Sequence, residues 1–362
     1  MTDLEKARLL INDTDKEMAR LFEQRMDAVK MVCAYKKEYG IPVEDLTREQ
    51  EMVKSNITAV DNEEYRPYYV NFLQSVVELS KSYQHRLLDG LRVAYSGVEG
   101  AFAGIVAKRI FPEATCVPCS SFKAAYNAVV DGQCDCALLP VENSFNGDVG
   151  KVLDLAFFGS LYVTGIYEAE IVQNLLGVPG TALTDVKKVI SHPQALGQCA
   201  AYIAEHGFEA VEAVNTAVAA QQVAELGQKE IAAIGSEEAA VKFGLTKLDS
   251  HINEKSNNTT RFAMFSRAEK TPTKKDDHFI LLFTVKNIAG SLGQAISIIG
   301  EHGFNLRALK SRPTKELIWE YYFYAEGEGN IGSKEGRAML NELRGCCSHI
   351  KVLGSFEKEM KL

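Results

Sequence analysis

The first 39 residues carry a helical pattern of apolar side chains that constrains the fold of this chain more than any other feature. These side chains recur at the spacing of one helix face. Gly40 is a typical helix stop, and Pro42 cannot continue the hydrogen-bond ladder. The pattern therefore predicts a single helix of more than 30 residues that ends near Tyr39. The apolar positions are Leu10, Ile11, Leu21, Phe22, Met26, Val29, Val32 and Cys33.

Two shorter helices are predicted after it. Thr47 and Gln50 have the spacing of a capping box, which predicts a helix that starts near Thr47. A third helix is predicted from about residue 63 to residue 87, with Pro67 tolerated in its first turn. So long a first helix cannot bury its whole apolar stripe on two shorter partners, so we expect an intertwined dimer.

From Leu91 onward, short β-rich runs alternate with helical stretches, which is typical of an α/β fold. Polar turns at residues 143–147, 191–194 and 235–236 each follow a predicted strand and precede a helix. Open α/β sheets bind their ligands at such places. We therefore expect one site built from several strand ends. The predicted strands include LRVAY, CDCALLPVE, SLYVTGIY, VKKVISHP and EIAAIG.

A polar, charged linker, AEKTPTKKDD, covers residues 268–277. After it the chain reads strand, helix, strand, strand, helix, strand, and this order predicts a ferredoxin-like α+β domain. The segments are HFILLFTV, a helix over residues 291–301, NLRALKSRP, ELIWEYYFYAE, a helix over residues 334–343, and HIKVLGSF.

Composition excludes several classes of protein. A formal net charge of -8 argues against a nucleic-acid binder, which needs a basic surface. No apolar run approaches the roughly 20 residues that span a bilayer. The start, MTDLEKARLL, lacks the layout of a secretory signal, so we expect a cytoplasmic protein.

Eight cysteines leave a metal alternative open. In a cytoplasmic chain we expect reduced thiols. The pairs Cys116/Cys119 and Cys134/Cys136 have a short spacing at which four thiolates can hold zinc. Buried free thiols at strand ends are the simpler interpretation.

Charged and polar residues of the helical segment have a spacing that suggests a pocket. Arg25 and Lys36 are eleven residues apart and project from nearly the same helix face. Arg8 lies about 100° away around the axis, which suits an arginine offered to a neighbouring subunit. Each charge taken singly could instead be a solvated surface residue. The other polar candidates are Asp45, Arg48 and Glu49 on the second helix and Ser80 and Gln84 on the third.

This set resembles, position by position, the helical class of chorismate mutases. The resemblance implies that Arg25, with Arg8 from the partner chain, holds the two substrate carboxylates, and that Lys36 and Gln84 face the ether oxygen. A Claisen rearrangement needs only positioning and stabilisation of charge on that oxygen, which such residue types supply. The remaining implied contacts are Glu49 at the ring hydroxyl and Asp45, Arg48 and Ser80 in the pocket wall.

Five motifs of the middle segment together resemble prephenate dehydratase across residues 92–267. The resemblance suggests Thr260 as the residue most directly involved in expelling the ring hydroxyl. The positions implied in substrate binding are Arg261, Asn143, Ser191 and Gln198, with Ser144 and Thr216 beside them. The motifs are GVEG at residues 97–100, PVENS at 140–144, SHPQALGQC at 191–199, NTA at 215–217 and NTTRF at 258–262.

The implied reaction removes carbon dioxide and hydroxide from prephenate, so the site must protonate the leaving hydroxyl. A threonine needs a charge-assisted partner for this task, and Arg261 is the candidate. Whether Thr260 is the acid or only orients the hydroxyl stays open, as does the choice between an acid and a structural role for His192. Val98 stands where the family commonly has Pro, and alanines replace the hydroxyl residues after it. This variation is compatible with activity if backbone N–H groups at a helix start bind the carboxylate there.

Two motifs near the C-terminus resemble those by which the ACT module of this family binds phenylalanine. Lys310 stands where the family usually has Glu, which leaves the affinity and the identity of the inhibitor open. Feedback inhibition through this module would be allosteric, because effector and substrate occupy different domains. A turn glycine at Gly290 and an ordinary strand end at residues 311–313 are the plainer alternative. The motif residues are Ala289, Gly290, Ser291 and Leu292, and Ser311, Arg312 and Pro313.

The sequence thus predicts a multidomain enzyme of phenylalanine biosynthesis. Residues 1–89 form an all-α three-helix intertwined chorismate mutase domain, residues 90–268 a two-lobed α/β dehydratase domain like periplasmic binding proteins, and residues 278–357 a ferredoxin-like ACT domain. The chain would act on chorismate and prephenate as a homodimer or tetramer, without metal or organic cofactor. A dehydratase with a lapsed mutase that serves dimerisation and a non-catalytic metabolite sensor remain alternatives.

Overall fold

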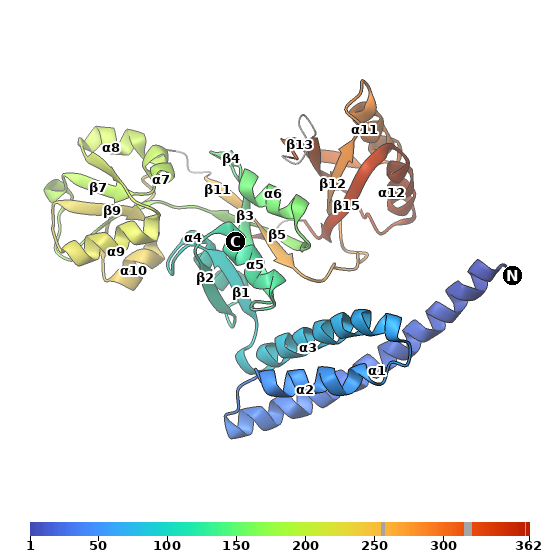
Figure 1. Cartoon of the computed structure of the whole chain (residues 1–362). Coiled ribbons are helices and arrows are strands. Elements are labelled where there is room, and N and C mark those ends of the chain that lie inside the picture. The colour runs from blue at the N-terminus through green and yellow to red at the C-terminus, as the bar shows by residue number, and fades with distance from the viewer. Residues whose placement is uncertain (255–257, 315–320, 359) are drawn as a thin grey trace. The chain divides into compact units, whose positions relative to one another are not determined.

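The computed structural model describes residues 1–254, 258–314, 321–358 and 360–362, apart from the side chain of Leu46. The chain divides into two compact units, Met1–Arg92 and Val93–Leu362 (Figure 1). Among the described residues, no helix is both long and apolar enough to cross a membrane.

The first unit consists of helices. Its first helix, α1 (Asp3–Tyr39), runs unbroken for 37 residues and ends at Gly40 in the left-handed conformation, which confirms the predicted length and stop. The second helix, α2 (Leu46–Ile57), begins earlier than predicted, because the Asp45 side chain accepts a hydrogen bond from the Arg48 amide and takes the capping role expected of Thr47. A 3-10 turn, η1 (Glu63–Tyr65), leads into α3 (Arg66–Asp89), which has proline in its first turn as predicted.

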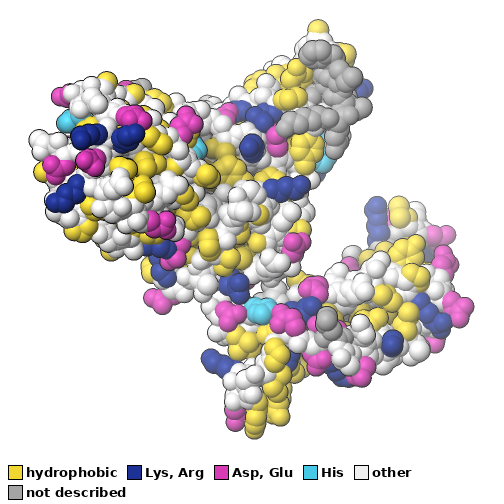
Figure 2. Space-filling model, turned by 60° about the vertical axis from the view of Figure 1, so that its left-hand side comes forward, with side chains coloured by type: hydrophobic (Ala, Val, Ile, Leu, Met, Phe, Trp, Pro, Cys, Tyr) yellow, Lys and Arg dark blue, Asp and Glu magenta, His cyan; other side chains and the backbone are white. Residues whose placement is uncertain are grey.

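Only part of α1 is covered by the other helices. Val29 and Cys33 of α1 are buried, and so are Leu73 and Val76 of α3. The other half of α1 is open to solvent, with Leu10 71% exposed. Hydrophobic side chains are accordingly visible over the surface of the helical unit (Figure 2). The exposed apolar residues of this half are Leu4, Leu9, Leu10, Ile11, Met18, Leu21 and Phe22.

The second unit begins with an α/β lobe around a seven-stranded sheet in the order β16-β5-β11-β3-β1-β2, with β4 paired to β3. β11 lies antiparallel between β3 and β5, so strands from distant parts of the chain meet at its centre. The strands are β1 (Arg92–Ser96), β2 (Thr115–Cys119), β3 (Cys136–Asn143), β4 (Gly147–Asp148), β5 (Tyr162–Glu170), β11 (Thr259–Ser266) and β16 (Met360–Lys361). The helices are α4 (Phe102–Ile110), α5 (Phe122–Val130) and α6 (Gly150–Phe158).

A second α/β lobe is inserted between β5 and β11, so the chain crosses between the lobes twice. Its five-stranded sheet has the order β10-β6-β9-β7-β8, in agreement with the predicted two-lobed α/β arrangement. The strands are β6 (Asn174–Gly177), β7 (Lys188–Ser191), β8 (Glu209–Glu212), β9 (Ile231–Gly235) and β10 (Thr246–Asp249). The helices are η2 (Leu183–Asp185), α7 (Pro193–Gln198), α8 (Ala200–His206), α9 (Thr216–Leu226) and α10 (Glu237–Phe243).

The C-terminal part has the predicted β-α-β-β-α-β succession and a four-stranded antiparallel sheet in the order β13-β14-β12-β15. Residues 315–320, which include the start of one predicted strand, lie outside the described residues. The elements are β12 (His278–Val285), α11 (Ser291–Glu301), β13 (Asn305–Pro313), β14 (Tyr321–Glu328), α12 (Lys334–Cys346) and β15 (Cys347–Phe356).

Both faces of this C-terminal sheet are buried. Phe279 and Leu281 of β12 pack on one face in a core shared with α11 and α12. Ile280 and Leu282 alternate with them and join Val163 of β5 in the core of the first lobe. The C-terminal sheet and the first lobe therefore form one packed body, which allows direct contacts between them.

Candidate active sites

Arg25 of α1 and Ser80 of α3 meet across the core of the helical unit. The Arg25 guanidinium donates a hydrogen bond to Ser80 Oγ, and Ser80 is 4% exposed. Burial lowers the pKa of Arg25. Gln84 lies one turn further on α3 and is also buried, and its Oε1 has no hydrogen-bond partner among the described residues. Ser80, which Arg25 contacts, and the buried acceptor Gln84 thus lie one helical turn apart on α3.

Lys36 and Glu49 extend the polar set toward α2. Lys36 Nζ donates to the Val43 carbonyl at 2.7 Å, just beyond the end of α1. Glu49 accepts from Lys81 Nζ at 3.2 Å. Lys81, which the sequence analysis missed, is a largely buried cation beside Ser80, with only 18% of its side chain exposed.

The remaining helical candidates lie at the surface. Arg48 is exposed, with its guanidinium 3.9 Å from the Glu51 carboxylate. Arg8 is exposed on α1, about 25 Å along the helix axis from Arg25. Arg8 therefore cannot reach the Arg25 side chain of its own chain.

In the second unit, Asn143 at the end of β3 has its side-chain amide fixed from both sides. Its Oδ1 accepts the backbone N–H groups of Phe145 and Asn146, each at 3.0 Å. The amide nitrogen must therefore point the other way, where it donates to Thr260 Oγ1 at 2.9 Å and to Asn258 Oδ1 at 2.9 Å. Because this bond uses Thr260 Oγ1 as an acceptor, the hydroxyl hydrogen of Thr260 can be donated to another oxygen.

A chain of buried amides continues from this pair toward the second lobe. Asn258 Nδ2 donates to Gln198 Oε1 at 3.0 Å, and Gln173 Nε2 donates to the same oxygen at 3.3 Å. Gln198, the acceptor, lies in α7 of the second lobe, whereas Asn143 lies in β3 of the first lobe. The predicted residues Asn143, Thr260 and Gln198 are thus joined through Asn258, across the lobe crossing.

Ser144 joins the same strand ends, because its Oγ accepts from the Thr259 amide at 3.0 Å. Ser191 and Thr216 belong to the second lobe. Ser191 is fully buried at the end of β7 and donates to the Ile234 carbonyl at 2.7 Å. Thr216 is the first residue of α9. Both lie at strand-to-helix turns, where the sequence predicted site residues.

Arg261 does not join this group. Its guanidinium contacts Glu142 at 3.0 Å and Glu326 of the C-terminal sheet at 3.0 Å. The expected charge-assisted contact with Thr260 is not made, because consecutive residues of a strand point to opposite faces of the sheet. Asn143, and not Arg261, is the hydrogen-bond partner of Thr260.

His192 caps α7, and its Nδ1 accepts from the Gln194 amide at 3.2 Å. Burial lowers the pKa of His192, which keeps the ring neutral near neutral pH. The structural alternative for His192 is therefore the one that the geometry favours. The helix start that follows the GVEG motif is that of α4. Ala101 precedes this helix, and no side chain among the described residues forms a capping hydrogen bond there.

The two C-terminal motifs make contacts with different parts of the second unit. Gly290 adopts the left-handed conformation (φ 87°) before α11, and Leu292 lines a cavity of about 450 Å³ with Lys286, Tyr321 and others. Arg312 instead forms a two-pronged ion pair with Asp154 of α6, at 2.8 and 3.1 Å, which raises the pKa of Arg312. Arg312 thus binds the first lobe.

The cysteines form no metal site in the described structure. All eight are free thiols, and no group of three or more His, Cys, Asp or Glu residues is gathered for a metal in the parts of the chain that the structure describes.

Several polar residues of the site were not singled out from the sequence. Asn258 belongs to the quoted NTTRF motif but was given no role. Gln173 and Asn174 interrupt the apolar run IVQNLLG with two amides, a signal that could have marked them. Asn174 is 3% exposed and donates to the Gly235 carbonyl.

Comparisons with known proteins assign both units. The model of the prephenate dehydratase family matches residues 93–270, and that of chorismate mutase type II matches residues 7–85. A bifunctional chorismate mutase/prephenate dehydratase of Aquifex aeolicus is 28% identical over 99% of this chain and 99% of its own length. An arogenate dehydratase/prephenate dehydratase of Arabidopsis thaliana is 31% identical over 75% of this chain and 73% of its own.

Among solved structures, prephenate dehydratase of Arthrobacter aurescens in complex with L-Phe is 26% identical, with a TM-score of 0.69 over 74% of this chain and 90% of that one. These matches define the second unit as a prephenate dehydratase and the first as a helical chorismate mutase. The chain belongs to the bifunctional chorismate mutase/prephenate dehydratases, and both enzyme activities are its own.

Proposed function

We propose that prephenate is dehydrated at the ends of β3 and β11, with Thr260 as the residue that delivers a proton to the departing ring hydroxyl or orients it. The observation that carries this proposal is the hydrogen bond from Asn143 to Thr260 Oγ1. It holds the threonine oxygen as an acceptor and leaves its hydrogen for the substrate, as general acid catalysis requires. When Thr260 gives its proton, the ring hydroxyl leaves as water together with carbon dioxide, phenylpyruvate remains, and solvent returns a proton to Thr260.

The other polar residues of this region hold the substrate. Gln198 is held to the Thr260 pair through Asn258, and Ser144 closes the same strand ends. Ser191 and Thr216 contribute from the second lobe. Contacts from both lobes would exclude water from a carboxylate that must leave as carbon dioxide.

Chorismate is rearranged in the helical unit. Arg25 binds one substrate carboxylate, and Lys36 and Gln84 stabilise the charge that develops on the ether oxygen. The buried Gln84 Oε1 without a described partner supports a polar ligand at this point. The other contributors are Ser80, Asp45, Arg48 and Glu49.

Arg8 completes this pocket from a second copy of the chain. The distance of about 25 Å between Arg8 and Arg25 along one helix supports this assignment. The exposed apolar half of α1 also supports it, because an intertwined second copy would cover that stripe. The enzyme is therefore a homodimer or a tetramer of such dimers.

The C-terminal sheet binds phenylalanine as a feedback inhibitor. The complex of the Arthrobacter aurescens relative with L-Phe supports this assignment. The binding residues would come from Ala289, Gly290, Ser291 and Leu292 beside the cavity of about 450 Å³, together with Ser311, Arg312 and Pro313.

A coupled assay tests the proposal. The purified chain is given chorismate, and phenylpyruvate is followed by its absorbance in alkali. We expect product from chorismate and from prephenate. Product from prephenate alone would select the lapsed mutase, and no product from either would select the sensor. Arogenate in place of prephenate tests the substrate preference.

Lys36→Ala separates the two activities. We expect mutase turnover to fall by about 10³-fold or more, since an oxyanion-stabilising group is lost. Dehydratase turnover of added prephenate should stay at the wild-type value, because Lys36 belongs to the other unit. Loss of both activities in a folded variant would contradict independent sites.

A further inference from the structure

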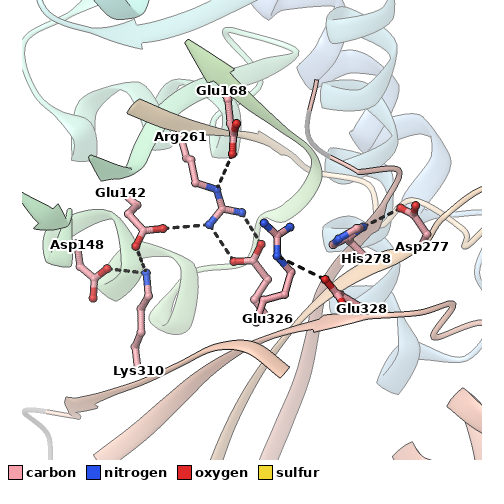
Figure 3. Close-up of polar contacts among 10 residues, drawn as sticks. Glu142, Asp148, Glu168, Arg261, Asp277, His278, Lys310, Glu326 and Glu328 are labelled. Atoms are coloured by element: carbon pink, nitrogen blue, oxygen red, sulfur yellow. Dashed lines mark hydrogen bonds and ion pairs between the residues drawn. The ribbon is translucent and has the colours of Figure 1, made fainter. Parts of the chain in front are cut away.

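A cluster of charged side chains, of which Glu326 is buried and the others are partly buried, lies directly behind the Thr260–Asn143 pair. In the sheet register, Thr260 stands opposite Asn143, and Arg261 stands opposite Glu142. Each residue of the proposed catalytic pair is therefore the chain neighbour of a charged residue that points to the other face of the sheet. Figure 3 shows Arg261 and Glu142 joined there to Glu326 and Lys310 from the C-terminal sheet.

Glu326 holds Arg261 with both carboxylate oxygens. Oε2 accepts from Nη1 at 3.0 Å, and Oε1 contacts Nη2. The Glu326 side chain is 1% exposed and that of Arg261 is 15% exposed, so water competes little for the hydrogen bonds between them. Burial by itself lowers the pKa of Arg261, but the bonds to Glu326 and Glu142 raise it overall, and the guanidinium stays charged. Paired bonds of this kind fix direction as well as distance.

Lys310 holds Glu142 by a single contact from the neighbouring strand β13. Its Nζ lies 3.1 Å from Glu142 Oε1 and also contacts Asp148. The ammonium is 5.6 Å from the ring centroid of Tyr324, a distance at which a cation–π interaction also holds it in place. Burial acts to raise the pKa of Glu142, but Arg261 and Lys310 lower it overall, so this carboxylate is also charged.

We propose that Glu326 and Lys310 are positioning residues of the dehydratase: from the C-terminal sheet they fix Arg261 and Glu142, and thereby set the spacing of Thr260 and Asn143. The proposal rests on the role given to Thr260 above. Arg261 then acts through the backbone of β11 and does not touch prephenate. Glu326 and Lys310 lie on the adjacent strands β14 and β13. The C-terminal sheet therefore contacts both β11, which carries Thr260, and β3, which carries Asn143.

The test uses the full-length chain and four variants. Glu326→Gln and Lys310→Met each remove one charge from the cluster. Lys310→Arg keeps the charge. Glu328→Gln is a matched control, because Glu328 lies two residues along the same strand, is 48% exposed and contacts Asn305 and Arg307 of the edge strand β13. For each variant, kcat and KM are measured with prephenate, kcat with chorismate, and unfolding by urea.

We expect Glu326→Gln and Lys310→Met to lower dehydratase kcat by about 10- to 100-fold, the effect of a small misplacement of catalytic groups. KM for prephenate should change by less than about threefold, because no substrate contact is lost. Lys310→Arg should restore most of kcat, and Glu328→Gln should match the wild type. Mutase turnover should be unchanged in all four.

Wild-type dehydratase kcat in folded Lys310→Met would overturn the proposal, and so would a raised KM at unchanged kcat, which would make Arg261 a substrate ligand. If Glu326→Gln does not fold, the Lys310→Met and Lys310→Arg pair decides the question alone. Thr260→Val separates this inference from its foundation. If that variant keeps wild-type kcat, the proposed role of Thr260 fails, whatever the cluster variants do.

Discussion

In the proposed dehydratase site, the hydrogen bond between Asn143 and Thr260 places a weak acid for proton delivery. A threonine hydroxyl in water is a poor proton donor, so its usefulness depends on position. Two backbone N–H groups donate to Oδ1 of the Asn143 side chain and so fix the orientation of its amide. The amide nitrogen then donates to Thr260 Oγ1 and fixes the position of that oxygen. Each bond restricts the next, and the site needs no charged acid at this point.

Removing the Thr260 hydroxyl tests this account. We expect Thr260→Val, which keeps the branched shape, to lower dehydratase kcat by about 10²- to 10⁴-fold, the usual contribution of a general acid. Thr260→Ser should retain part of the activity, because it keeps the hydroxyl. The measurement is phenylpyruvate formation from prephenate, with mutase turnover as the internal control. A Thr260→Val variant as active as Thr260→Ser would refute the role.

His192 should make stability depend on pH in a definite direction. Burial lowers its folded-state pKa below the ordinary value of about 6.5. As the pH falls through that value, the unfolded chain takes up the proton first, so the stability contributed by neutral His192 is present above about pH 6.5 and is lost below it.

The comparison with His192→Asn isolates this effect from the other histidines, because asparagine also caps a helix. We expect the wild type to lose more of its free energy of unfolding than His192→Asn between pH 7.5 and 5.5, as measured by urea denaturation. Parallel curves for the two proteins over this range would show that His192 does not titrate as proposed.

Motifs in the sequence marked residues that the structure brings together at the candidate site, but not their hydrogen-bond and ion-pair partners. Asn143, Gln198 and Thr260 were each marked by a motif. The pairing of Arg261 with Glu326 spans 65 residues and depends on how one sheet packs on another. No local pattern encodes such a contact, and the hydrogen-bonding role of Asn143 toward Thr260 was missed for the same reason.

At the scale of elements, local signals predicted well where they had no competitor. The bounds of α1, β12, α11 and β13 follow directly from period, capping and turn residues. The start of α2 did not, because Asp45 and Thr47 are both good capping residues and only one can be used. β8 was missed because all four of its residues are exposed at a sheet edge, where no apolar alternation is required.

The contact between β15 and β5 should be intolerant of any side chain at Gly354. A Cβ atom there would lie 2.0 Å from the Val163 carbonyl oxygen, a backbone atom that cannot turn aside. We expect Gly354→Ala to cost about 1–3 kcal/mol of unfolding free energy, as overpacking does. Gly345→Ala in α12, with nothing within 4 Å, is the control and should stabilise by about 0.5–1 kcal/mol. Urea denaturation measures both, and equal effects would contradict the packing argument.

At the scale of the whole molecule, the proposed shared pocket predicts that one copy of the chain is an incomplete mutase. Its long helix carries Arg8 and Arg25 too far apart to share a ligand and leaves an apolar stripe exposed. A second copy would supply the missing cation and the missing cover together. Because each pocket would then use Arg8 of one chain and Lys36 of the other, two inactive variants can complement one another.

We expect Arg8→Ala and Lys36→Ala each to lack mutase activity alone. In a mixed dimer, one pocket collects both substitutions and the other collects neither. Random pairing makes half of the dimers mixed, so coexpression should restore about a quarter of wild-type mutase activity per chain. Dehydratase activity, measured in the same samples, should remain at the wild-type value throughout. A mixture as inactive as its parents, with dimers demonstrated by sedimentation, would place Arg8 outside the shared pocket.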